Sequence, residues 1–205
     1  MSDGSIVHII DDDEILRLSL DSLFRSVGLK TAVYGSAKEF LDAKCPDPVS
    51  CLVVDVRLPG LSGLEFQDQL ARSGNAIPVI LMTGHGDIPM TVRAMKAGAV
   101  DFLPKPFRDQ DMLDAVSSAL ALSRRQRESG AELDALTTRF EGLSPREKQV
   151  MALVTKGLMN KQVAGELSLS EVTVKIHRGA AMRKMEARSL AELVKMADQL
   201  RLHEG

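Results

Sequence analysis

Over the first 122 residues, short apolar runs alternate with amphipathic stretches. The runs are typical of strands that are buried on both faces of a parallel sheet, and the stretches are typical of helices. The predicted strands are Ser5–Ile10, Lys30–Tyr34, Cys51–Val54, Pro78–Met82 and Val100–Leu103. The predicted helices are Glu14–Val27, Ser36–Ala43, Ser62–Ser73, Ile88–Ala97 and one that begins at Asp109. The pattern predicts an α/β domain with a flavodoxin-like, doubly wound, parallel five-stranded sheet.

The stretch 123–142 is polar and charged, and it predicts a helix that continues the preceding one or follows it. Gly130 is the expected break, because glycine is a poor helix former. After Gly142 no strand pattern remains. The sequence therefore predicts three parts, namely an α/β domain over 1–122, a helical linker over 123–142 and an all-α domain over 143–205.

Four helices are expected in the all-α domain. A capping box at Ser144 and Glu147, with Pro145 at the first helical position, opens the first helix. A second box at Ser189 and Glu192 precedes the last. The predicted ranges of the other three helices are Asn160–Leu167, Glu171–Met185 and Leu190–Leu200.

Composition restricts the class of protein. Aromatic residues make up only 3% of the 205, with no Trp, so we expect an aliphatic core. No apolar run approaches the length of a membrane span, and the N-terminus lacks the pattern of a signal peptide. Cys45 and Cys51 do not make a disulfide framework, and reduced thiols in a cytoplasmic protein are the simpler interpretation, with a redox pair as the alternative.

Charge is distributed unevenly along the chain. Residues 1–122 carry 11 basic and 17 acidic side chains, whereas residues 143–205 carry 11 basic and 7 acidic ones. This asymmetry favours different partners for the two halves. The basic excess agrees with nucleic-acid binding but is also typical of a solvated helical domain.

Acidic residues follow two of the predicted strands. Asp11 and Asp12 come after the first strand, and Asp55 comes after the third. In a sheet of order 2-1-3-4-5 these strands are neighbours at the topological switch point, where ligands bind. Three close carboxylates repel one another without a cation, and an oxygen-ligand site of this kind suits Mg²⁺.

Two further residues complete this chemistry. Thr83 follows the fourth strand and Lys105 the fifth. A carboxylate can attack phosphorus, and positive charge from Mg²⁺ and Lys105 would stabilise the transferring group. The alternative is that such acids only cap helices, which is the simple interpretation of Asp13 and Glu14.

The segments IIDDDEILR, LVVDVRLPGLSGLE, ILMTGHGDIPM and AGAVDFLPKPF strongly resemble the response regulator receiver family. The resemblance implies that Asp55 is the phosphoacceptor, with Thr83, Lys105 and the aromatic residue Phe102 as switch and catalytic positions. It also implies a cis Lys105–Pro106 bond. The implied Mg²⁺ ligands are Asp12, Asp55, the backbone carbonyl of Arg57 and, through water, Asp11.

A short helix, a three-residue turn and a longer helix over 160–185 form a helix-turn-helix pattern. On Glu171–Met185 the expected core side consists of Val172, Val174 or Ile176, Ala180 and Met185. The expected outer side consists of Lys175, His177, Arg178, Arg183 and Lys184. Gly179 weakens a helix by roughly 1 kcal/mol relative to Ala, so we expect a reason for it.

The last 63 residues resemble a LuxR-type DNA-binding domain, through the blocks NKQVA and SEVTVKIH. The DNA contacts implied by this resemblance are Asn160, Lys161, Ser170, Thr173, Lys175, Ile176, Arg178 and Gly179. Met159 stands where relatives have a small polar residue, and Gly179 stands where many have a longer side chain. These two positions depart from the family pattern.

The whole chain is most similar to FixJ-like regulators. The resemblance implies a transcription factor that a sensor histidine kinase phosphorylates on Asp55. It further implies a homodimer formed through the receiver, binding to promoter DNA, contact with RNA polymerase, and control of nitrogen-fixation or microaerobic genes. The alternatives are another pathway, or a helical output domain that binds protein. A phosphatase is disfavoured, because Arg57 stands where such enzymes place a second acid.

Overall fold

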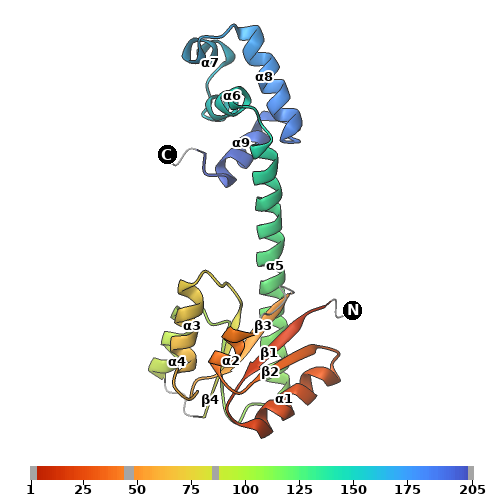
Figure 1. The fold of residues 1–205 in the computed structure, drawn as a ribbon, viewed down its shortest axis with the longest axis vertical. Helices are drawn as coiled ribbons and strands as arrows, with labels where there is room; N and C mark the ends of the chain where they lie inside the picture. The colour runs from red at the N-terminus through yellow and green to blue at the C-terminus, as the bar shows by residue number, and fades with distance from the viewer. Residues whose placement is uncertain (1–3, 44–48, 85–87, 203–205) are drawn as a thin grey trace. The chain divides into compact units, whose positions relative to one another are not determined.

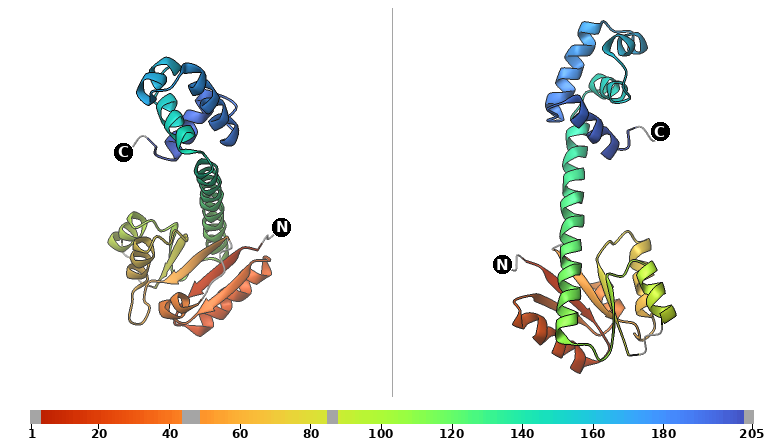
Figure 2. Two further views of the ribbon diagram at one scale, coloured as in Figure 1. Left: turned by 45° about the horizontal axis from the view of Figure 1, so that its top comes forward. Right: turned by 180° about the vertical axis from the view of Figure 1, so that it is seen from behind.

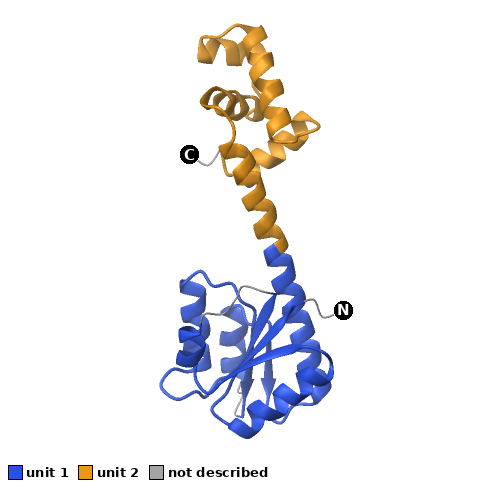
Figure 3. Cartoon of the chain, turned by 45° about the vertical axis from the view of Figure 1, so that its right-hand side comes forward, with its two compact units in different colours: residues 1–127 blue, residues 128–205 orange. Residues whose placement is uncertain are grey.

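The computed structural model of the chain describes residues 4–43, 49–84 and 88–202. The chain forms two compact units, 1–127 and 128–205 (Figure 3). The strands of the first unit are β1 (Ile6–Ile10), β2 (Lys30–Tyr34), β3 (Ser50–Asp55), β4 (Val79–Thr83) and β5 (Asp101–Pro104) (Figure 1). Its helices are α1 (Glu14–Ser26), α2 (Ala37–Asp42), α3 (Gly63–Arg72), α4 (Ile88–Lys96) and the beginning of α5 (Asp109–Glu141). Each predicted element is confirmed, and the predicted ends differ by one residue at most.

The five strands form one parallel sheet in the order β2-β1-β3-β4-β5. This order confirms the predicted flavodoxin-like sheet. It places β1 and β3 side by side, with Ile10 opposite Val54, so both strands end at the same edge. The acids that follow these two strands are therefore brought together.

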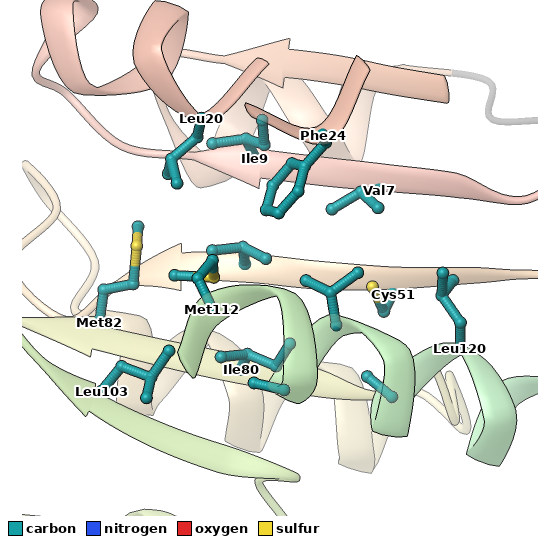
Figure 4. Close-up of a cluster of buried hydrophobic side chains, with 14 residues drawn as sticks. Val7, Ile9, Leu20, Phe24, Cys51, Ile80, Met82, Leu103, Met112 and Leu120 are labelled. Carbon is teal, nitrogen blue, oxygen red and sulfur yellow. The ribbon is translucent and has the colours of Figure 1, made fainter. Parts of the chain in front are cut away.

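Helices cover both faces of the sheet, as Figure 2 shows with α1 on one side and α3 and α4 on the other. On one face, α1 and α5 bury side chains such as Phe24 and Met112 against Ile9 and Ile80 (Figure 4). On the other face, α2, α3 and α4 bury a second cluster that includes Phe66. Burial on both faces explains why the strands are continuously apolar.

The core is mainly aliphatic, as expected, but the few aromatic residues are concentrated in it. The buried phenylalanines are Phe24, Phe40, Phe66 and Phe102. Phe40 makes edge-to-face contacts with Tyr34 and Phe66. Cys51 is buried too, and burial raises the pKa of its thiol to about 12, so it is not a reactive thiolate. Cys45 lies outside the described residues, so the alternative of a redox pair between Cys45 and Cys51 lies outside them too.

The predicted break at Gly130 is wrong, because α5 runs without interruption from Asp109 to Glu141. One interior glycine costs a helix about 1 kcal/mol, and the residues around it are good helix formers such as Ala, Glu and Leu. The packing of Leu136, which is 5% exposed in the second unit, outweighs that cost. Residues 128–141 thus belong to the second compact unit.

The remaining helices of the second unit are α6 (Pro145–Thr155), α7 (Asn160–Leu167), α8 (Glu171–Lys184) and α9 (Leu190–Gln199), which confirms the four predicted. The capping box at Ser144 and Glu147 is complete. The predicted box at Ser189 is only half formed. Ser189 accepts a hydrogen bond from the Glu192 amide, but the Glu192 carboxylate takes the amide of Arg188 instead. Within the described parts of the chain, no helix has the length and apolar character of a membrane span.

Candidate functional site

The carboxyl edge of the sheet gathers four of the predicted residues. Asp11 follows β1, Asp55 ends β3, Thr83 ends β4 and Lys105 follows β5. Asp11, Asp55 and Thr83 are buried. The Lys105 Nζ lies 2.7 Å from the Asp11 Oδ2 and 2.7 Å from the Asp55 Oδ1. The sheet thus brings two carboxylates onto one ammonium group.

Backbone groups hold the two carboxylates in place. The Arg57 amide donates to the Asp55 Oδ2 at 2.7 Å, and the Asp13 amide donates to the Asp11 Oδ1 at 2.9 Å. Each carboxylate therefore keeps one oxygen on a backbone amide and the other on Lys105. Asp13 itself only caps α1, where its side chain accepts the amide of Ile15 at 2.9 Å, as the simple interpretation proposed.

Gly63 fixes the backbone beneath Asp55, and sequence reasoning missed it. A Cβ at this first residue of α3 would lie 2.4 Å from the backbone oxygen of Asp55. No side chain can occupy that space without moving the strand end. The signal was present in LVVDVRLPGLSGLE, but only the structure shows that the second of its two glycines meets Asp55.

The electrostatics of the site favour a fixed positive charge. Burial raises the pKa of the Asp11 carboxyl, an effect to which Asp55 adds and which Lys105 only partly offsets. Burial also lowers the pKa of Lys105, but its hydrogen bonds and charge contacts with both carboxylates raise it above the ordinary value. Lys105 therefore stays protonated, while burial disfavours the anionic form of the Asp11 carboxyl.

The donor set fits Mg²⁺ in part. Among the described residues, no three His, Cys, Asp or Glu side chains converge closely enough to hold a metal by themselves. Mg²⁺ needs no such cage, since it keeps several waters and binds one or two carboxylates. Asp11 and Asp55, the two carboxylates that share Lys105, supply oxygen ligands of the kind that Mg²⁺ binds. Asp12, the next residue after Asp11, is exposed.

Phe102 lies on β5 and is buried in the cluster under α4, with Ala94. Its position in the core agrees with an ordinary strand residue as well as with the expected switch. The Lys105–Pro106 peptide bond is cis, as the resemblance implied.

In the second unit, α7 and α8 are joined by Ser168, Leu169 and Ser170, which confirms the predicted turn. Ser168 adopts the left-handed conformation, with φ of 54°. Ser170 caps α8 by accepting the Thr173 amide, and the two hydroxyl oxygens lie 2.8 Å apart. Two predicted DNA contacts thus also form the cap of this helix.

The faces of α8 differ in part from the prediction. Val174, Ala181 and Met185 are fully buried, so Val174 rather than Ile176 belongs to the core. Val172, which was also expected in the core, is 66% exposed. The reason is helical spacing, because residues seven and eleven positions after Val174 share its face and Val172 lies on the opposite one. Ala180 is correspondingly only half buried.

Charged residues expected on the outside fall into two groups. Lys175, Arg183 and Lys184 are exposed, as is Lys161 of α7, a predicted DNA contact, whereas His177 and Arg178 are half buried. Arg178 is half buried and donates to the Asn160 Oδ1 at 3.3 Å, so it ties α8 to α7. The Lys184 Nζ lies 2.7 Å from the Glu147 Oε2, and no pattern in the sequence predicts this contact.

The chain matches two family models, the response regulator receiver domain over residues 7–117 and the luxR family of bacterial regulatory proteins over residues 141–197. It is 59% identical to nodulation protein W of Bradyrhizobium diazoefficiens over 97% of this chain and 88% of that protein. It is 46% identical to the transcriptional regulatory protein FixJ of Azorhizobium caulinodans, covering 96% and 93%. The solved structure of the response regulator StyR is 47% identical, with a TM-score of 0.83, over 95% and 98%.

The parallel sheet with its carboxylate edge is a receiver domain, and the second unit is a LuxR-type helix-turn-helix domain. The chain belongs to the FixJ-like two-component response regulators, which are transcriptional regulators. Membership implies a sensor kinase as partner of the receiver and DNA as partner of the second domain. Receiver domains generally bind Mg²⁺ at the phosphorylation site.

Proposed function

We propose that a sensor histidine kinase phosphorylates Asp55 and that this modification turns on promoter binding. The observation that carries the proposal is the position of Lys105, whose Nζ lies 2.7 Å from both the Asp55 and the Asp11 carboxylates. The raised pKa of Lys105 keeps it protonated over the whole physiological range. A protonated amine at that point neutralises charge where a phosphoryl group would arrive.

In the transfer, an Asp55 oxygen bonds to phosphorus while the bond from phosphorus to the donor nitrogen breaks. Asp12, Asp55, the carbonyl of Arg57 and, through water, Asp11 would hold Mg²⁺, which supplies positive charge to the phosphoryl oxygens. Lys105 would exchange its contact with Asp55 for one with the new phosphoryl group. Arg57 and Asp13 amides keep the two carboxylates oriented during this exchange.

Thr83 and Phe102 would pass the change on. Thr83 ends β4 beside β5, and its backbone oxygen accepts the Lys105 amide at 2.6 Å. Its hydroxyl would turn toward the phosphoryl group, and Phe102 would repack into the space that it leaves. Both side chains are buried, so such a change must alter the packing of α4 and β5.

Dimerisation is the proposed result. Ile88, Val92 and Met95 are exposed at positions four and three residues apart on α4, which makes one apolar stripe. A second copy of the chain would cover this stripe. Two paired helix-turn-helix domains read a longer operator than one, which is why specificity would follow dimerisation.

On DNA, α8 would lie in the major groove, with Lys175 and Ile176 facing bases. Ser170, Thr173 and Lys161 would meet the phosphate backbone. Arg178 and Asn160 would orient α8 against α7, through their 3.3 Å contact, and approach DNA from the junction. Gly179 would permit close approach of the helix. At the promoter, the cytoplasmic dimer would contact RNA polymerase and activate transcription.

Nitrogen fixation stays a prediction for the controlled genes. A nodulation protein is 59% identical to this chain and a FixJ protein is 46% identical. The regulated genes can therefore belong to nitrogen fixation or to another process, such as nodulation.

The test measures sedimentation and DNA binding of the full chain, with and without acetyl phosphate and Mg²⁺. We expect monomers that become dimers, and sequence-selective, salt-dependent binding that rises with phosphorylation. A helical output that binds protein instead would show no salt-dependent binding to duplex DNA. A phosphorylated monomer that binds its operator tightly would contradict dimerisation as the switch.

A further inference from the structure

The recognition helix α8 carries an apolar stripe on the face turned away from its own domain. Val172 is 66% exposed and Ile176 is 64% exposed, four residues apart. Gly179 follows three residues later. Helical spacing places all three opposite the buried face of Val174 and Ala181. These aliphatic side chains therefore contribute nothing to the core of the domain.

Gly179 extends the stripe without any structural need for glycine. A Cβ there would meet only the end of the flexible Arg183 side chain, at 3.7 Å. Glycine weakens a helix interior relative to alanine, and the described residues offer no compensating close contact. What glycine does provide is a flat helix surface that another molecule can approach closely.

The surroundings of the stripe indicate which molecule this is. Lys175 is exposed beside it, and Lys161 is exposed on α7. The hydroxyls of Ser170 and Thr173 lie at the start of the helix. The cations and hydroxyls suit a polyanion. The apolar stripe between them suits a polyanion that carries apolar groups inside a groove. The thymine methyl groups are the apolar groups that the major groove of DNA presents.

We propose that Val172 and Ile176 read two thymine methyl groups, with Gly179 allowing the helix to seat deeply enough for both contacts. The inference rests on the proposed DNA-binding function and names the chemistry of its specificity. Four helical residues span about 6 Å, and base pairs are about 3.4 Å apart. The two thymines therefore lie about two base pairs apart in each half-site.

The experiment first selects duplexes from a random library with the full chain, acetyl phosphate and Mg²⁺. Each thymine of the selected operator is then replaced by uracil, which removes only the C5 methyl group. In each half-site we expect two uracil substitutions, about two base pairs apart, to weaken binding by about threefold to fourfold each, the value of one buried methyl group. The remaining thymines of the operator should tolerate uracil.

Variants assign each methyl group to a side chain. At one of the two thymine positions of each half-site, Val172→Ala should bind the thymine duplex and the uracil duplex with equal affinity. At the other position it should still bind the uracil duplex more weakly. Ile176→Ala should show the reverse. Val27→Ala, at a valine that is 51% exposed in the receiver, is the matched control and should keep both sensitivities. Circular dichroism verifies that each variant folds, which the exposure of these side chains leads us to expect.

Two outcomes separate this inference from the function on which it rests. An operator that binds selectively but shows no methyl-sensitive thymine, or the same sensitivities in Val172→Ala as in the unchanged protein, overturns the inference alone. A library from which no sequence is enriched overturns the DNA-binding function and the inference together.

Discussion

Lys184 and Glu147 form an ion pair with 2.7 Å between the Nζ and the Oε2, joining the last turn of α8 to the first turn of α6. The same carboxylate oxygen accepts the Ser144 amide at 2.7 Å, and Glu147 is 7% exposed. One carboxylate therefore caps α6 and anchors the end of the recognition helix. We therefore expect the stability of the DNA-binding domain to depend on the ionisation of Glu147.

Glu147→Gln tests this point, because glutamine can keep the capping hydrogen bond but not the ion pair. The hydrogen bond from Lys184, followed by that from Ser144, lowers the pKa of Glu147 below its ordinary value of 4.5. The stabilisation is therefore complete above about pH 4.5 and is lost as the pH falls through the lowered pKa. Thermal melts from pH 7 to 3 should show a smaller acid-induced loss of stability in the variant. Parallel pH profiles for the two proteins would show that the ion pair contributes nothing to the free energy of unfolding.

Leu136→Ala should destabilise the second unit by about 2–4 kcal/mol, although Leu136 lies on α5. Its side chain is 5% exposed and packs in the core with Val150 and Leu193, among others. Leu133→Ala is the matched control, since Leu133 lies one turn earlier and is 46% exposed. Denaturant unfolding of the full chain measures both. If the two variants lose equally little stability, the end of α5 is only a linker.

Gly63→Ala should impair phosphorylation while Gly130→Ala should not. A Cβ at Gly63 would lie 2.4 Å from the Asp55 backbone oxygen, so the loop that carries the acceptor must shift. At Gly130 nothing lies within 4 Å of the added Cβ, and the helix should gain up to about 1 kcal/mol. Labelling rates with acetyl phosphate and melting temperatures distinguish the two. An unchanged labelling rate in Gly63→Ala would disprove the close approach.

The sequence predicted most of the fold because burial on both faces makes the strands of the receiver continuously apolar. The site was predictable for the same reason, since residues at the ends of parallel strands must meet at one edge. Asp11, Asp55 and Lys105 are in contact although 94 positions separate Asp11 from Lys105. Strand order, more than any one residue, carried that prediction.

What the sequence could not show depends on contacts between distant segments. Val172 was placed in the core because apolar residues at 172, 174 and 176 allow more than one helical phase. Only the packing of α8 on α6 and α7 selects Val174. Likewise, no local pattern records the pairing of Lys184 with Glu147. The continuation of α5 through Gly130 depends on the helix formers around it and on the packing of Leu136 in the second unit.

The central claim is that Asp55 accepts the phosphoryl group, and the most direct measurement is site mapping. The full chain is incubated with acetyl phosphate and Mg²⁺, and the acyl phosphate is reduced with borohydride and located by mass spectrometry. We expect modification at Asp55 and its loss on removal of Mg²⁺. A folded Asp55→Asn variant should not be labelled. Asp68→Asn, a control on the surface of α3, should be labelled at the normal rate. Labelling of Asp55→Asn at the rate of the unchanged protein would contradict the account.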